Sequence, residues 1–369
     1  MMRLAAALGI ALAIRAAAGV APTPGNLIAW GRRTAVLSST ATVLEATEGL
    51  NSSFAFSRDA GNGSIQFHVG GRVEASDASQ DLSMERMLGH LPALVAEPKD
   101  VLVVGFGAGV TAGTFTQYPT VKRIVICEVE PKIPPSSTRY FPTQNYGVLH
   151  DPKTEIFYDD ARHFVLTSRE KFDLITSDPI HPFVKGSASL YSKEYFEMVR
   201  AHLTPQGIVT QWVPLYESDS ETVKSEIATF FEVFPGGQVF ANLSGSLGYD
   251  VVLMGRNGGG PIDIESVVAR SLQPSYAKVM ESLNDVGFKS AYELYGTFAA
   301  SHEDLRGWLS GAAINRDKDL RLQYLAGLSL NRQTGNDIYR EIVAKRTWPN
   351  RQFTGSVDSV TQLTPVLVN

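Results

Sequence analysis

The clearest pattern in the chain lies between Lys99 and Glu130, where two apolar runs flank a glycine cluster and a helix-like segment. The first run, Val101–Val104, has the length and β-branched content of a buried strand, and Arg123–Cys127 repeats that pattern. Three glycines follow the first run directly, at Gly105, Gly107 and Gly109. Glycine permits a tight turn and lets a ligand approach the start of the helix that follows. The segment therefore predicts a strand, a ligand-binding turn, a helix and a strand.

Apolar strands and amphipathic helices keep alternating further along the chain. Five more strands are predicted, over residues 154–158, 172–176, 208–213, 238–243 and 249–254. Helices are predicted between them, over residues 193–203 and 220–234. Alternation of this kind is typical of a parallel sheet. The last two strands leave no room for a helix, so we expect an antiparallel hairpin at one side of a mostly parallel, seven-stranded α/β sheet.

The region before this sheet has a β pattern without helices. Ser53–Ser57 and Ser64–Val69 flank a cluster of turn residues, which predicts a hairpin. A second turn at Gly70 and Gly71 leads into another short strand. Residues 40–80 are therefore expected to form a small antiparallel β domain that acts as a lid or an interface.

The domain boundaries follow from these patterns. Ser83 is predicted to cap a helix that opens the α/β domain, residues 81–256. The glycine-rich segment Asn257–Gly260 is read as a break. Beyond it, residues 261–369 show helical periodicity and little chemistry, and they are predicted to be a helical appendage.

The N-terminus requires a separate interpretation. Leu4–Ile14 is apolar and is followed by Arg15, which makes it short for a confident membrane span. It resembles either the apolar part of a signal peptide or the last part of a membrane helix from a longer parent. Residues 1–25 are therefore left out of the fold prediction, and attachment to a membrane through them stays open.

Composition excludes several classes of function. The net charge of −5 and the absence of a Lys/Arg run argue against nucleic-acid binding. The single cysteine, Cys127, rules out an internal disulfide and suits a reducing compartment, so we expect a cytoplasmic domain. The histidines show no metal-ligand spacing, and no metal is expected.

The candidate chemistry lies at the carboxyl ends of the predicted parallel strands, where ligands bind in sheets of this kind. Those ends hold the glycine turn and three acids, Glu128, Asp160 and Asp178. An acid at the end of the second strand can hold a ribose through its hydroxyl groups. The spacing is GxGxG, because Val110 occupies the last glycine position of the dinucleotide pattern GxGxxG. This difference favours an adenosyl-sulfonium ligand, which has no pyrophosphate. A plain packing turn, with Asp160 as a helix cap and Asp178 as a turn residue, is the structural alternative.

Five local motifs in order carry a family resemblance over roughly residues 50 to 255. They are Phe67–Gly71 (FHVGG), Met84–Pro92 (MERMLGHLP), Val103–Gly109 (VVGFGAG), Ile126–Glu130 (ICEVE) and the segment from Asp178 to Phe196. Together these motifs resemble the spermidine/spermine synthase family of polyamine aminopropyltransferases. The overall look is similar to bacterial spermidine-synthase-like domains that follow a membrane-transporter-like region.

The resemblance implies a methyltransferase-type Rossmann fold and a specific reaction. Family members move the aminopropyl group of decarboxylated S-adenosylmethionine to putrescine and release methylthioadenosine. By resemblance, Glu128 would hold the ribose, Asp160 the adenine amino group, and Asp178 would face the amine beside the sulfonium. The glycine turn would lie under the methionine-derived part. A small polyamine is the implied partner, and a homodimer is one alternative for the assembly.

Three departures from the family pattern fall in the amine half of the site. Ala108 stands where the family has a loop aspartate that helps to bind the donor ammonium. His181 replaces the aspartate that binds and deprotonates the attacking amine, and an imidazole can still act as a base. Glu85 replaces a histidine or glutamine and adds an acid. Tyr216 and Tyr249 are candidates to line the acceptor pocket, with core packing as the alternative for each.

Three functions therefore stay open. The first is aminopropyl transfer from decarboxylated S-adenosylmethionine to putrescine or a related amine. The second is methyl transfer from intact S-adenosylmethionine to a small molecule, because loss of the loop acid at Ala108 removes a charge that would repel the donor carboxylate. The third is a catalytically silent binding module attached to a membrane protein.

Overall fold

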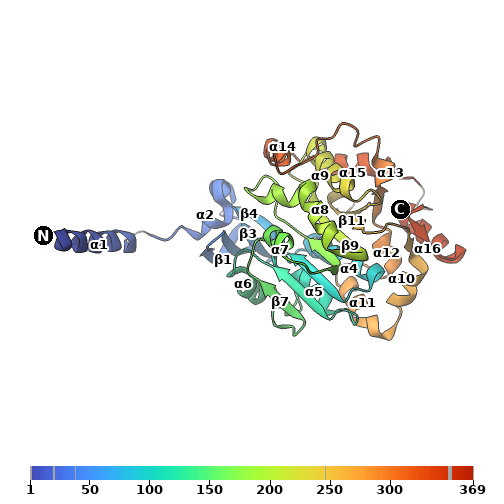
Figure 1. Ribbon diagram of the computed structural model, residues 1–369, viewed down its shortest axis with the longest axis horizontal. Helices are drawn as coiled ribbons and strands as arrows, with labels where there is room; N and C mark the ends of the chain where they lie inside the picture. The colour runs from blue at the N-terminus through green and yellow to red at the C-terminus, as the bar shows by residue number, and fades with distance from the viewer. Residues whose placement is uncertain (1, 20, 38, 246, 348–350, 369) are drawn as a thin grey trace.

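The computed structural model describes residues 2–19, 21–37, 39–245, 247–347 and 351–368. A first helix, α1 (Met2–Ala18), stands away from the body on an extended linker (Figure 1). No helix within the described ranges is both long and apolar enough to cross a bilayer. The body consists of a small sheet next to α2 and a larger part built around a central sheet (Figure 1).

The small sheet is antiparallel, with its strands in sequence order. Its strands are β1 (Ala41–Glu48), β2 (Ser53–Asp59), β3 (Ile65–Val69) and β4 (Arg72–Ser76). The predicted hairpin corresponds to β2 and β3, and its turn is held by Asp59 Oδ1, which accepts hydrogen bonds from the N–H groups of Gly61 and Asn62.

Two short helices that the sequence did not reveal, α2 (Gly25–Trp30) and α3 (Thr34–Leu37), lie against the small sheet. Trp30 packs edge-on against His68, whose Nδ1 lies 3.0 Å from the Ala29 carbonyl. Each helix is about one turn or slightly longer, which is too short for apolar periodicity to show in the sequence.

The central sheet has eight strands in the order β13-β10-β11-β9-β8-β5-β6-β7. Their bounds are β5 (Asp100–Val104), β6 (Arg123–Cys127), β7 (Thr154–Phe157), β8 (Phe172–Ser177), β9 (Leu203–Pro214), β10 (Gln238–Ser244), β11 (Leu247–Arg256) and β13 (Phe298–Ser301). The first five along the chain are parallel, and β10 and β11 form the expected antiparallel hairpin. The eighth strand, β13, pairs with β10 and was not predicted, since four residues from the C-terminal region are too few to show a strand pattern.

Helices cover both faces of this sheet. They are α4 (Ser79–Ala96), α5 (Val110–Thr116), α6 (Ile133–Tyr140), α7 (Ala161–Thr167), α8 (Lys193–His202) and α9 (Ser220–Val233). Alternate residues of β5 and β6 belong to opposite cores, with Val101 and Ile124 in the core that includes α4 and α5, and Leu102 and Val125 in the core that includes α7, α8 and α9. This burial on both faces explains the unbroken apolar runs of these strands.

Helix α4 begins earlier than the sequence indicated. It starts at Ser79 with Ala78 as its N-cap, so Ser83 lies inside the helix and is not its cap. The first turn is polar and carries Asp81. Apolar periodicity begins only at Leu82, and the sequence therefore placed the start one turn too late.

The region beyond residue 260 packs onto the rest of the body. It contains β12 (Ile262–Asp263), α10 (Ile264–Ser271), α11 (Ala277–Asn284), α12 (Ala291–Tyr295), β13, α13 (His302–Leu305), α14 (Arg321–Ser329), α15 (Gly335–Val343), β14 (Phe353–Thr354) and α16 (Val357–Val368). The Tyr295 hydroxyl donates to the Leu91 carbonyl at 2.7 Å, and His90 Nε2 lies 2.9 Å from Ser282 Oγ. The predicted helical appendage thus also supplies a strand to the central sheet and buried contacts to α4.

Candidate active site

The glycine turn after β5 opens onto a cavity. Gly105 and Gly107 have φ values of 84° and 53°, in the left-handed region that favours glycine. A Cβ added at either position would meet no atom within 4 Å, so the turn faces open space. At Gly109 an added Cβ would lie 2.7 Å from Phe106 Cε1. The first two glycines therefore expose backbone to a ligand, while Gly109 allows Phe106 to pack.

Glu128 links the glycine turn to the end of β6. Its Oε2 accepts a hydrogen bond from the Phe106 N–H and its Oε1 accepts one from the Glu130 N–H, both at 2.8 Å. The side chain is 4% exposed, and burial raises the pKa of its carboxyl group, with the two N–H donors opposing that shift. Each carboxylate oxygen keeps a second acceptor position. Glu128 can therefore hold a ligand hydroxyl while it fixes the turn.

Asp160 caps helix α7, which is the structural role that the sequence offered as an alternative to ligand binding. Its Oδ1 accepts from the N–H groups of Arg162 at 2.8 Å and His163 at 3.2 Å. Asp160 also lines the large cavity next to Asp159. The two interpretations are compatible, because the cap uses only one of the two carboxylate oxygens.

The large cavity, of about 790 Å³, lies between the carboxyl edge of the central sheet and the small sheet. The glycine turn, Glu128, Asp160 and Asp178 line one side of it. Phe67 and Val69 of β3, together with Leu27 and Ile28 of α2, line the other side. Of the residues predicted to bind a nucleoside, the cavity brings together Gly105, Gly107, Glu128, Asp160 and Asp178, with apolar side chains facing them, whereas Gly109 does not line it.

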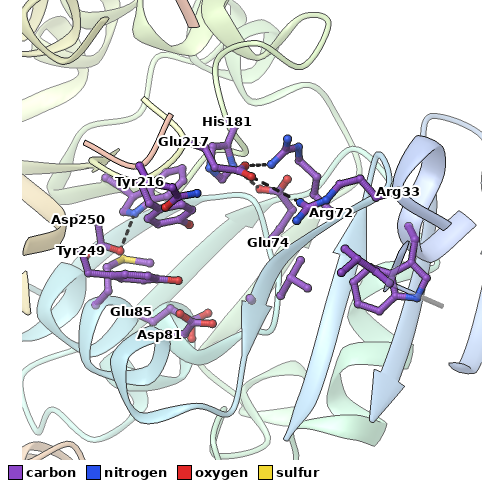
Figure 2. Close-up of a pocket in the computed structure, with 17 residues that line it drawn as sticks. Arg33, Arg72, Glu74, Asp81, Glu85, His181, Tyr216, Glu217, Tyr249 and Asp250 are labelled. Atoms are coloured by element: carbon purple, nitrogen blue, oxygen red, sulfur yellow. Dashed lines mark hydrogen bonds and ion pairs between the residues drawn. The ribbon is translucent and has the colours of Figure 1, made fainter. Parts of the chain in front are cut away.

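A second cavity of about 300 Å³, which we call the acid cavity, lies beside the first. Five carboxylic acids line it, and Figure 2 shows them arriving from several elements: Glu74, Asp81, Glu85, Glu217 and Asp250. Two arginines, Arg33 and Arg72, also line it. Both arginines form ion pairs with Glu217. The remaining four acids have no Lys or Arg partner among the described residues.

A narrow cavity of about 50 Å³, which we call the waist, shares its lining with both others. Gly105, Gly107 and Asp178 line the waist and the large cavity. Glu74 and Glu85 line the waist and the acid cavity. A molecule in the large cavity and a molecule in the acid cavity would therefore meet at the waist.

Asp178 follows β8 directly and reaches the waist. Burial raises the pKa of its carboxyl group to about 7, and the nearby carboxylates of Glu74 and Asp81 contribute to that increase. A carboxylate whose pKa lies near neutrality can accept a proton under physiological conditions. Asp178 therefore has the position and the basicity of a general base.

His181 faces the acid cavity and is 2% exposed. Its Nδ1 lies 3.2 Å from Glu74 Oε2, and its ring packs against Phe183, Trp212 and Tyr216 at centroid distances of 5.1, 5.1 and 5.3 Å. A carboxylate partner at Nδ1 favours the tautomer with the proton there. The other nitrogen, Nε2, would then be an acceptor, and it has no hydrogen-bond partner among the described residues.

Tyr216 and Tyr249 both line the acid cavity and stack on each other, with ring centroids 4.5 Å apart and planes 23° apart. Next to them, the Trp212 Nε1–H donates to Asp250 Oδ2 at 3.2 Å. Burial raises the pKa of the Asp250 carboxyl group well above its ordinary value. The two tyrosines thus form an aromatic wall beside an acid.

Several cavity residues were missed from the sequence. Glu74 and Asp250 lie in strands, where an acid among apolar residues was an available but weak signal. Glu217 has a φ of 50°, unusual for a residue other than glycine, and no sequence pattern revealed it. Trp30 and Arg33 come from the short helical segment before the small sheet, for which no element was predicted. Within the described ranges, no group of His, Cys, Asp and Glu side chains is arranged to hold a metal ion.

The fold and the cavities define a methyltransferase-like α/β protein with a small antiparallel sheet at its ligand edge. Residues 81–241 match the spermine/spermidine synthase domain family. The matched segment begins within α4 and ends within β10, so it contains the glycine turn and the strand ends that line the large cavity.

Relatives with known names agree with this assignment. The chain is 26% identical to a spermidine synthase of Dictyostelium discoideum over 234 residues, which are 61% of this chain and 78% of the relative. It is 33% identical to a polyamine aminopropyltransferase of Nitrosomonas europaea over 35% of this chain and 40% of that protein. The chain thus spans well under two thirds of the second relative.

Solved structures share the fold. A spermidine synthase in complex with the transition-state analogue AdoDATO superimposes with a TM-score of 0.55 at 20% identity, covering 66% of this chain and 88% of that one. The spermidine synthase of Thermotoga maritima gives a TM-score of 0.53 with the same identity and coverage.

Proposed function

We propose that the chain is a polyamine aminopropyltransferase that moves the aminopropyl group of decarboxylated S-adenosylmethionine to putrescine or a related amine. The observation that carries this proposal is the waist, which joins a cavity suited to a nucleoside to a cavity lined by acids. A donor bound on one side can there meet a cationic acceptor bound on the other.

The donor would occupy the large cavity. Its ribose hydroxyls would donate to the free acceptor positions of Glu128, and its adenine would lie toward Asp160 at the start of α7. The sulfonium and the aminopropyl chain would then pass over Gly105 and Gly107, whose exposed backbone leaves room for them. In this arrangement the carbon next to the sulfur would lie at the waist.

The acceptor would occupy the acid cavity as an ammonium ion. Four carboxyl groups that have no arginine or lysine partner among the described residues would stabilise its positive charges, and Tyr216 and Tyr249 would pack against its methylene groups. We propose that His181 Nε2 accepts a hydrogen bond from the acceptor, while Glu74 holds the other side of the ring.

The reaction would then be a displacement at carbon. The attacking amine must first lose a proton, and Asp178 is the base that the geometry and its raised pKa support best. The amine nitrogen forms a bond to the carbon beside the sulfonium while the carbon–sulfur bond breaks. The bonding electron pair goes to sulfur, and methylthioadenosine leaves as a neutral thioether.

Product analysis tests this function directly. We expect methylthioadenosine when the protein is mixed with putrescine and decarboxylated S-adenosylmethionine. S-adenosylhomocysteine formed from intact S-adenosylmethionine would instead support methyl transfer. If neither methylthioadenosine nor S-adenosylhomocysteine forms with any amine of a panel, the result would contradict catalysis and support a silent module.

Membrane attachment and the oligomeric state stay predictions. Attachment to a membrane, or fusion to a transporter-like region, would act through residues 1–25, where Leu8, Ile10, Leu12 and Ile14 are each more than half exposed. Comparing membrane fractions of the full chain and of a chain that starts at Gly25 tests the attachment. Light scattering of the same two proteins tests whether the protein is a homodimer.

A further inference from the structure

The acid cavity carries opposite charges on its two sides. Three acids lie together on one side in Figure 2, and they are Asp81, Glu85 and Asp250. Arg33 and Arg72 lie on the other side, next to Glu217 (Figure 2). Both arginines share the single carboxylate of Glu217 and have no other ion-pair partner among the described residues. We call the wall formed by Arg33, Arg72 and Trp30 the arginine side, and it holds more positive than paired negative charge.

The arginine side forms where two backbone segments approach each other closely. Arg33 ends the short segment Gly31–Arg33 directly after α2, and Arg72 is the first residue of β4. A Cβ added at Gly71 would lie 3.0 Å from Gly31 Cα, so a larger residue there would push the two segments apart. Two like charges held this closely repel each other unless an anion lies between or beside them.

Two buried N–H donors on the arginine side have no acceptor. Arg72 is 8% exposed and Trp30 is 5% exposed, and both residues line the acid cavity. Within the described part of the chain, Arg72 Nη2 and Trp30 Nε1 have no hydrogen-bond partner. Buried polar atoms are nearly always paired, and guanidinium and indole nitrogens can only donate. The group that completes this wall is therefore an acceptor, and next to a guanidinium a carboxylate forms the strongest hydrogen bonds.

The electrostatics of Arg72 agree with an anionic partner. Burial, together with the neighbouring positive charge of Arg33, lowers the pKa of the Arg72 guanidinium to about 10. A carboxylate bound at Nη2 would offset both effects. The second ammonium group of a plain diamine would instead add a third positive charge at the same place. The arginine side therefore favours an anion over the far end of putrescine.

We propose that the acceptor is an amine that carries a carboxylate at the end away from the attacking nitrogen, as a basic amino acid does. This inference rests on the proposed function and names the class of acceptor for it. The attacking amine would point toward the waist, and the carboxylate would accept hydrogen bonds from Arg72 Nη2 and Trp30 Nε1. The oxygens of Glu217 keep further acceptor positions for an ammonium group next to that carboxylate.

Two matched pairs of acceptors test the inference: putrescine with ornithine, and cadaverine with lysine. The members of each pair differ only in one carboxylate. The measurement is the rate at which methylthioadenosine forms from decarboxylated S-adenosylmethionine with each acceptor. We expect kcat/KM to be at least about tenfold higher for ornithine than for putrescine, and for lysine than for cadaverine, as expected for a charged hydrogen bond gained in a buried site.

Variants of the arginine side should change this preference. Arg72→Gln should lower kcat/KM for ornithine by about tenfold and raise it for putrescine, because it removes a positive charge that faces the second ammonium. Arg72→Lys keeps that charge and should retain part of the preference. Trp30→Phe keeps an aromatic ring and removes only the N–H group, so the preference should fall by about threefold. Arg139→Gln is the matched control, since Arg139 pairs with Glu45 outside all three cavities and the ratio should stay at the wild-type value.

The outcomes separate this inference from the proposed function. If the wild-type protein releases methylthioadenosine but uses each diamine at least as efficiently as its carboxylated partner, the inference is overturned and aminopropyl transfer stands. Equal losses for both members of a pair in folded Arg72→Gln and Trp30→Phe proteins would make the arginine side structural and would also overturn it. No methylthioadenosine from any of the four acceptors would overturn the proposed function itself.

Discussion

The large cavity and the acid cavity are built in opposite ways. Backbone geometry forms much of the large cavity, through the positive-φ glycines after β5, the N–H groups that fix Glu128 and the start of α7 at Asp160. These features come from consecutive elements of one sheet. The acid cavity depends on side chains from the short N-terminal helices, β4, α4, β9 and β11, which are far apart in the sequence.

The difference shows where specificity can change without loss of the fold. A nucleoside cavity made of turns and helix caps leaves little freedom for substitution, because a change there also changes the backbone at the ends of the strands. A cavity lined by side chains can change one residue at a time, as at His181 and Glu85, where the resemblance implies an aspartate and a histidine or glutamine. We therefore expect changes in the first cavity to affect donor binding, and changes in the second to affect the acceptor and its reaction.

The largest expected effect comes from Asp178, which lines both the large cavity and the waist. Asp178→Asn removes the proposed base at the waist and should lower turnover by about 100- to 10,000-fold, the usual contribution of general base catalysis. Methylthioadenosine affinity should change little, because amide and carboxyl groups have the same shape. Steady-state kinetics and calorimetry on the same protein measure the two effects. Full turnover in this variant would remove Asp178 from the mechanism.

The same substitution should change stability in a pH-dependent way. The Asp178 carboxyl has a pKa of about 7 in the folded protein, above its ordinary value of 3.8, so the folded state holds a proton that the unfolded chain releases between these values. Stability therefore falls as pH rises through this window. Asparagine cannot ionise, so Asp178→Asn should gain about 1–4 kcal/mol over the wild type above pH 7, at about 1.4 kcal/mol per pKa unit.

Urea unfolding at pH 4 and pH 8 measures this difference. The advantage of the asparagine variant should be present at pH 8 and should largely disappear at pH 4. An equal difference at the two pH values would show that Asp178 keeps an ordinary pKa, and the assignment of the base would lose its electrostatic support.

Glu128→Ala tests the backbone-built cavity. It removes the acceptors for the Phe106 and Glu130 N–H groups and for the ribose, so methylthioadenosine affinity should fall by about 1–3 kcal/mol. Glu128→Gln is the matched control, since its amide oxygen can still accept one N–H bond and should lose less. Unchanged affinity in a folded alanine variant would contradict the nucleoside assignment of the large cavity.

The smallest catalytic effect is expected at His181. His181→Ala should lower turnover by about tenfold through loss of one hydrogen bond to the acceptor, and leave methylthioadenosine binding unchanged. His181→Asp should strengthen putrescine binding, because it adds a carboxylate to the acid cavity. The exposed His150, outside all three cavities, is the control position for alanine substitution. Wild-type turnover in His181→Ala would make this side chain purely structural.

The sequence predicted the sheet and the nucleoside side of the site because both follow local rules. The apolar runs of β5 and β6, the glycines between them and the acid after β6 are contiguous, and parallel strands bring their carboxyl ends to one edge. The Asp160 cap was also visible as a local alternative. The charges of the acid cavity could not be predicted in this way. Glu74 and Asp250 meet only because β4 and β11 approach through tertiary packing, which no local pattern encodes.

The departures from the family pattern at Ala108 and His181 also have different consequences in the folded chain from those expected from the sequence. Ala108 appeared to remove a cation-binding acid from the site, yet its position is fully buried and lines none of the three cavities, and Glu74 lines the waist. His181 appeared to replace a carboxylate in the amine half of the site, yet Glu74 Oε2 lies 3.2 Å from His181 Nδ1. A substitution can therefore be interpreted only together with the distant residues that surround it.

The central claim is that the large cavity and the acid cavity form one site joined at the waist. A single compound in which a diamine is linked through a thioether to adenosine would fill both, and its affinity measures the connection directly. We predict that this conjugate binds about 100-fold more tightly than methylthioadenosine, since analogues that span the reacting groups gain at least that much. An affinity no higher than that of methylthioadenosine alone would show that the two cavities are separate, and would contradict the proposed transfer between them.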